Sequence, residues 1–153
     1  QGIKRSDTAV ISKIAAYTVK EANSDVRVGI KALFYWATHG RKNVEECFRN
    51  ARKDIYVDLV ADLNDTNMLI LKASILAKEA FSRKVYRAYT ELSKQNHETP
   101  CSYVHFCNQL SYLQSLGMIT LFSTKVNKTY ANRVSVLCNQ DIIREVYGIR
   151  FNT

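Results

Sequence analysis

The chain has 153 residues, of which 46% are apolar and 24% charged, an ordinary composition for a globular protein with one domain or two small ones. Its formal net charge of +8 favours a polyanionic partner, with nucleic acid ahead of a membrane surface. No run approaches the roughly 18 uncharged apolar residues of a membrane span, and no signal peptide is visible. We therefore expect no membrane partner.

The first 62 residues show helical periodicity and no strand signal. A first helix is expected from Ser6 or Asp7 to about Ala22, a second from Val26 to His39, and a third after Asn43. The predicted inward residues are, helix by helix, Val10, Ile14 and Tyr17; Ile30, Leu33, Phe34 and Ala37; and Cys47, Phe48, Ala51 and Ile55. Alone, these helices predict a three-helix bundle spanning residues 1–62.

The second half, residues 63–153, begins after the short polar segment Asp62–Asp65. A fourth helix is expected from Asp65 or Thr66, with Leu69, Lys72, Ala73 and Leu76 on its inner side. A fifth helix is expected to be capped by Ser82, and a short last helix to run from Asn139 to about Tyr147. This half carries more positive charge, with 11 Lys and Arg against 6 Asp and Glu, whereas residues 1–62 carry 11 against 8.

The stretch from Thr99 to Cys138 organises this second half. Pro100 and Ser102 are typical of a helix start, and Gly117 is suited to a left-handed C-terminal cap. Between them one apolar stripe repeats at helical spacing, formed by Phe106, Leu110 and Leu113.

Two β-prone segments follow that helix directly. Residues 118–123 and 133–138 are rich in β-branched and apolar residues, and the polar, basic segment 124–132 separates them. A helix, a glycine and a hairpin with a basic tip form the order of a winged helix-turn-helix domain, which presents a helix to the DNA major groove and a hairpin to the backbone or minor groove. The fold class predicted for the chain is therefore mainly α with a small β-hairpin, a three-helix bundle followed by a winged helix.

Candidate DNA contacts follow from this arrangement. On the recognition helix they are Ser102, Val104, His105, Asn108 and Tyr112; on the hairpin Lys125, Lys128 and Arg133; and at the start of the fifth helix Arg83 and Lys84. The alternative for the helix residues is a solvated polar face. Exposed lysines on a hairpin equally serve solubility or edge protection.

The four cysteines, Cys47, Cys101, Cys107 and Cys138, form no CxxC pair. Cys101 and His105 share one helix face, but no second pair of ligands accompanies them, so buried or half-buried thiols are the expectation rather than a metal site. The sequence also lacks a GxxxxGK[ST] phosphate-binding loop and an acid–base pair, so no enzyme activity is expected of this chain.

The segment Ala22-Asn23-Ser24-Asp25-Val26-Arg27-Val28-Gly29-Ile30-Lys31-Ala32-Leu33 resembles the G-D-x-R-x-A-L segment of AAA+ replication initiators of the origin-recognition and cell-division-cycle loader family. Residues 85–89, 102–106 and 110–119 are similar to the winged helix of the archaeal members. The resemblance covers nearly the whole chain, and it implies the C-terminal part of such an initiator, a helical lid followed by a winged helix.

This resemblance implies origin-specific double-stranded DNA binding and a cytoplasmic, nucleoid-associated protein. Arg27 would correspond to the sensor-2 arginine, which meets the phosphates of ATP or ADP held by an ATPase domain upstream; the residues of this chain would hold no cofactor themselves. Replicative helicase or other initiator subunits would be further partners. Without such a nucleotide, Arg27 is expected to pair near Asp25.

Two other functions remain open on the residues alone. A stand-alone winged-helix transcription regulator would use residues 1–62 to dimerise and would bind palindromic half-sites. A winged-helix protein-interaction module would bind DNA weakly and without specificity, in keeping with the thinly charged recognition helix.

Overall fold

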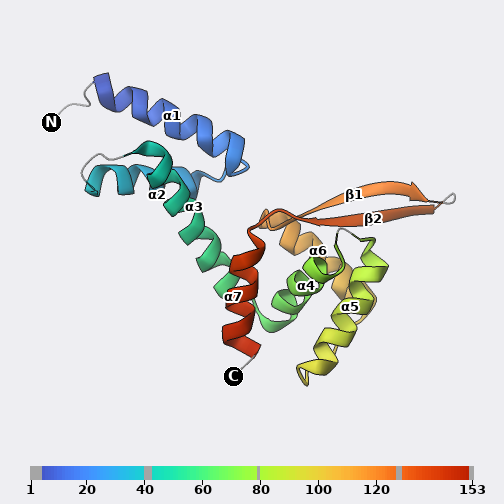
Figure 1. The fold of residues 1–153 in the computed structure, drawn as a ribbon. Helices are drawn as coiled ribbons and strands as arrows, with labels where there is room; N and C mark the ends of the chain where they lie inside the picture. The colour runs from blue at the N-terminus through green and yellow to red at the C-terminus, as the bar shows by residue number, and fades with distance from the viewer. Residues whose placement is uncertain (1–4, 40–42, 79, 127–128, 152–153) are drawn as a thin grey trace. The chain divides into compact units, whose positions relative to one another are not determined.

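The computed structural model describes residues 5–39, 43–78, 80–126 and 129–151. Figure 1 shows helices and one hairpin, confirming the predicted fold class. The elements in chain order are α1 (Arg5–Glu21), α2 (Val26–Thr38), α3 (Val44–Ala61), α4 (Asp65–Leu76), α5 (Ser82–Gln95), α6 (Tyr103–Ser115), β1 (Ile119–Val126), β2 (Thr129–Val136) and α7 (Gln140–Phe151).

The chain divides into two compact units, residues 1–59 and residues 60–153, and the division lies in the last turn of α3. Ala61, at the end of α3, and Leu63 both belong to the second unit and are held there by α7. The Arg150 guanidinium donates hydrogen bonds to the carbonyl oxygens of Ala61, at 2.6 Å, and of Leu63. Two carbonyls near the helix end thereby gain a charged donor.

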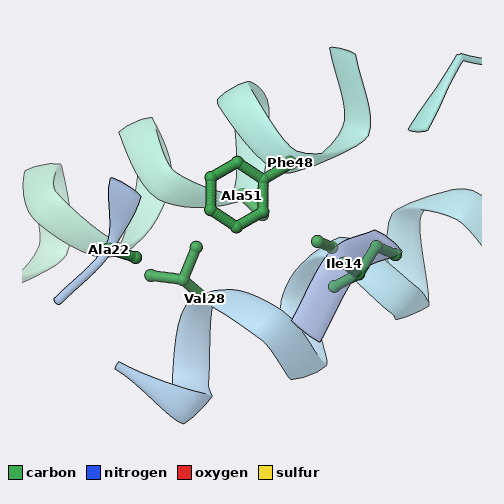
Figure 2. Packing of buried hydrophobic residues seen from close by; sticks show 6 residues of the cluster. Ile14, Ala22, Val28, Phe48 and Ala51 are labelled. Carbon is green, nitrogen blue, oxygen red and sulfur yellow. The ribbon is translucent and has the colours of Figure 1, made fainter. Parts of the chain in front are cut away.

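A small apolar core holds α1, α2 and α3 together in the first unit. Ile14 and Ala22 come from α1 and its C-terminal end, Val28 from α2, and Phe48 and Ala51 from α3 (Figure 2). Each of these side chains is almost completely buried. The stripes predicted for α1 and α3 are confirmed at Ile14, Cys47, Phe48 and Ala51.

The predicted inward face of α2 was wrong. Ile30 and Phe34 are 64% and 60% exposed, Ala37 is exposed and Leu33 is only partly buried, whereas Val28 and Ala32 are buried. Almost every residue of α2 is apolar, so helical period alone does not select a face. Close packing selects the side with the small residues: a Cβ on Gly29 would lie 2.8 Å from Oγ1 of Thr18.

The second unit is built around α4, whose residues are buried nearly all round. The expected inner positions Leu69 and Ala73 are buried, Lys72 is half-buried, and Leu76 is exposed because the helix ends there. In the contacts of this unit, α4 packs on α5, α6, α7 and β2. A helix without a polar face is expected at the centre of such a unit.

Aromatic rings join α5 to α6. Tyr86 meets Tyr103 and Phe106 edge-on, with ring centroids 5.1 Å apart in both pairs, and Tyr89 stacks on Phe106 at 5.8 Å. Ser82, predicted to cap α5, is instead buried in its first turn with its hydroxyl 3.1 Å from that of Tyr103. The N-cap position belongs to Phe81, because residues 80 and 81 pair in extended form with β2.

The cysteines are free thiols, buried at Cys47 and Cys138 and half-buried at Cys101 and Cys107. Burial raises the pKa of Cys138 to about 11, which favours its neutral form. Within the described residues no three His, Cys, Asp or Glu side chains gather closely enough to hold a metal ion. None of the described helices is both long and apolar enough to cross a membrane.

Candidate nucleic-acid interface

The start of α6 is fixed by side chains of α5. Tyr86 donates its hydroxyl to the carbonyl oxygen of Cys101 at 2.9 Å, and the amide of Cys101 donates to the hydroxyl oxygen of Tyr89 at 3.1 Å. The Ser102 hydroxyl oxygen then accepts the amide of His105 at 3.3 Å, the N-cap role expected of a serine at this position. These contacts hold α6 at a defined position on its unit.

The outer face of α6 is the one predicted from its apolar stripe. Phe106, Leu110 and Leu113 are buried as expected. The exposed residues, at helical spacing along the opposite side, are Val104, His105, Asn108, Ser111, Tyr112 and Ser115. Of the candidates named on this helix, Val104, His105, Asn108 and Tyr112 lie on this solvent-facing side, whereas Ser102 is exposed at the N-cap position.

The polar groups of this face differ in how free they are. The hydroxyls of Ser111 and Ser115 donate to carbonyl oxygens of their own helix, at 3.3 and 2.7 Å. His105 Nε2 lies 3.1 Å from Nε2 of Gln109. The exposed amide of Asn108 offers both a donor and an acceptor, the pairing that an adenine edge presents in the major groove. The face is polar but carries no Lys or Arg.

The hairpin begins where α6 ends. Gly117 has the positive φ of +72° that the left-handed cap needs, and β1 starts two residues later. The strands are longer than predicted and reach Val126 and Thr129, so segment 124–132 is mostly paired strand rather than loop. Thr, Val and Tyr favour extended backbone, which outweighs the polar character of this segment.

The strand register places the basic residues of the hairpin on different faces. Lys125 pairs with Tyr130 close to the described end of the hairpin, whereas Arg133 pairs with Phe122 further from that end. Both are exposed, and Lys128 lies outside the described residues. Arg83 and Lys84 are exposed in the first turn of α5, and Arg87 is exposed one turn later. No Asp or Glu stands between Met118 and Gln140.

Arg27 belongs to the first unit and forms an ion pair within the N-terminal turn of α2. Its Nε and Nη2 atoms lie 3.0 and 2.7 Å from the two carboxylate oxygens of Asp25, whose side chain also accepts the amide of Arg27. The guanidinium hydrogen bond holds the pKa of Asp25 below its usual value, against the opposing effect of partial burial. This is the pairing expected for Arg27 without a nucleotide.

Three exposed aromatic residues of the second unit are not among the predicted site residues: Phe81, Phe122 and Tyr130. Phe122 and Tyr130 lie on opposite faces of the hairpin, and Phe81 pairs with Arg133 from the other side of β2. Alternation along each strand could have placed the two hairpin residues. The bridge formed by Phe81 joins segments about 50 residues apart, so no local pattern of the sequence indicates it.

Among solved structures, the chain is similar to the Aeropyrum pernix Orc1 protein, which was determined in complex with DNA. The TM-score is 0.73 at 18% sequence identity, and the match covers 99% of this chain. The resemblance expected from the sequence is thus confirmed at the level of the fold. No protein-family model matches the chain, and no curated protein matches it. The chain corresponds to 43% of the length of the Orc1 chain, less than half of that protein.

Proposed function

We propose that this chain binds double-stranded DNA as the C-terminal part of an archaeal-type replication initiator, with α6 in the major groove and the β1–β2 hairpin on the backbone or minor groove. The observation that carries the proposal is the exposed polar face of α6 beside a basic hairpin, in a fold shared with a protein solved on DNA. The expected partner is origin DNA.

The distribution of charge supports a division of labour within this surface. Lys125, Arg133, Arg83 and Lys84 are exposed cations, suited to phosphate contacts that supply affinity. The uncharged face of α6 supplies base contacts, and Asn108 is its best donor–acceptor pair. Binding should therefore depend strongly on salt, with modest sequence preference.

The likeness over 99% of the chain also favours the initiator over a stand-alone transcription regulator, since the first unit takes part in the match. In an initiator that unit would act as the lid of an upstream ATPase domain. Arg27 would then leave Asp25 for a phosphate of bound ATP or ADP. Helicase and other initiator subunits would remain partners of the full protein.

Salt-titrated duplex binding tests the proposal. The variant Lys125→Ala/Arg133→Ala should lower affinity and reduce the log–log salt slope by about 2, because each lost phosphate contact removes about 0.9 from that slope. The matched control is Lys20→Ala/Lys53→Ala, which removes two exposed charges from the first unit. This control should keep the slope of the unmodified chain.

The protein-interaction alternative gives a different result. A chain that binds no duplex at low salt, or whose hairpin variant binds as well as the unmodified chain, would fit a protein-interaction module. For the helix, Asn108→Ala should reduce discrimination at one base position by roughly 1–3 kcal/mol and leave the salt slope unchanged. Equal loss on every sequence would mean that Asn108 does not read a base.

A further inference from the structure

The outer face of the hairpin carries an aromatic, a cation and a second aromatic in one row. Phe122 of β1 lies directly opposite Arg133 of β2, and Arg133 lies opposite Phe81 on its other side. Residues directly opposite in antiparallel strands point to the same face. The side chains of Phe81, Arg133 and Phe122 therefore stand next to one another across three extended segments.

This row is not part of the core. Phe122 is 57% exposed and Phe81 is 40% exposed, whereas Ile119 and Val134, on the opposite face of the same strands, are buried. Phe81 holds the N-cap position of α5 but makes no side-chain capping hydrogen bond. Neither ring is thus explained by packing or by capping, and leaving both in water costs hydrophobic free energy.

Cations outnumber acids in the sequence around the row. Arg83 and Lys84 follow Phe81 in the first turn of α5 and are exposed, and no acidic residue occurs from Met118 to Gln140, whereas Glu79 stands two residues before Phe81. Figure 1 shows the hairpin as a long two-stranded ribbon that reaches past helices α5 and α6 of the same unit. The combination is aromatic rings interleaved with cations on an open face.

We propose that Phe81, Arg133 and Phe122 form a second nucleic-acid surface, which binds unpaired bases of a single strand. Exposed rings surrounded by cations bind single strands because each base offers an aromatic face and each nucleotide a phosphate. A duplex cannot use such rings, since its base faces are stacked inside. The charge complementarity favours a nucleic acid over an uncharged apolar peptide, and the surface is separate from the outer face of α6.

The row has room for this function. Adjacent extended segments lie about 4.8 Å apart, so the two phenylalanines are separated by about 10 Å with the arginine between them. Each ring takes one base by stacking, and the guanidinium of Arg133 contacts the phosphate between those bases. Arg133 is shared with the proposed duplex contacts, whereas the two rings play no part in them, so substitutions of the rings distinguish the two proposals.

Fluorescence anisotropy with labelled oligo(dT), oligo(rU) and a duplex at low salt tests the inference. Phe122→Ala should weaken single-strand binding about 5- to 150-fold, the usual loss for one stacked base, and leave duplex binding within about twofold. Phe81→Ala should act in the same direction. Phe122→Trp keeps a stacking ring and should restore binding.

Leu137→Ala is the matched control, since Leu137 is another exposed apolar residue of this region. It should leave single-strand binding unchanged. The inference is overturned if the unmodified chain binds neither single strand, if Phe122→Ala binds like Leu137→Ala, or if Phe122→Ala loses duplex and single-strand binding equally. In the first two cases an apolar protein partner would better fit the row. The duplex proposal is judged separately, from the single variant Lys125→Ala, because Arg133 belongs to both proposed sets of contacts.

Discussion

Helices α2 and α6 expose chemically different sides to solvent, apolar in α2 and mostly polar in α6, although both are 13-residue helices with apolar stripes. In the second unit, α6 buries Phe106, Leu110 and Leu113 and exposes a mostly polar side, on which Val104 and Tyr112 are also exposed. In the first unit, α2 buries Val28 and Ala32 and exposes the larger Ile30 and Phe34. The first unit therefore leaves large apolar side chains of α2 in water, whereas the second unit buries the apolar stripe of α6.

An apolar stripe therefore predicts which face of a helix is buried only when the rest of the helix is polar. On α6 the opposite face contains Asn108, Ser111 and Ser115, so only one orientation buries the apolar residues. On α2 there are apolar residues on every side, and the orientation follows the close approach of Gly29 to Thr18.

The largest expected effect tests whether the two units unfold independently. Phe48→Ala and Phe106→Ala each remove a fully buried ring and should destabilise the unit that contains it by about 3–5 kcal/mol. Amide hydrogen exchange should show protection lost in α1 and α2 for the first variant, and in α4, α5 and α6 for the second. Equal loss throughout the chain in either variant would mean that the two units unfold as one.

A smaller effect tests the orientation of α2. Val28→Ala removes two buried methyl groups and should cost about 2 kcal/mol. Ile30→Ala, on the exposed side of the same helix, should change the free energy of unfolding by no more than about 0.5 kcal/mol. Chemical denaturation of both variants measures the difference. If Ile30→Ala costs more than Val28→Ala, the face originally predicted from the sequence is the buried one.

The smallest effect compares the N-caps of the two helices. Asp25→Ala and Ser102→Ala should each cost about 1 kcal/mol near neutral pH. Because the folded-state pKa of Asp25 is lowered, its contribution is present above the unfolded pKa of about 3.9 and is lost as the pH falls through the folded value. The cost of Asp25→Ala should therefore shrink in acid. The cost of Ser102→Ala should stay constant. Chemical denaturation at several pH values measures both costs, and an equal dependence on pH in the two variants would contradict this prediction.

The sequence was most informative where a local signal and the tertiary contacts agree. Ser102 and Gly117 mark the ends of α6 because their roles depend on the backbone of one turn. The outer face of α6 followed from its stripe, and so did the exposure of the candidates on it. Whether those candidates touch DNA is a matter of binding energy and stays a prediction.

Prediction failed where distant segments decide the structure. Ser82 was expected to cap α5, but the pairing of residues 80 and 81 with β2 places Phe81 at that position. The hairpin strands extend further than their polar residues suggested, since cross-strand pairing compensates for weak local patterning. The row of Phe81, Arg133 and Phe122 joins residues from three separate segments, so no short-range pattern reveals it.

The most direct test of duplex binding is to map exchange of backbone amides in the unmodified chain with and without duplex DNA. Duplex binding through the proposed surface predicts slower amide exchange in α6 and along β1 and β2, with no change in α1 and α2. A response confined to the first unit, or none along α6 at saturating duplex, would contradict it.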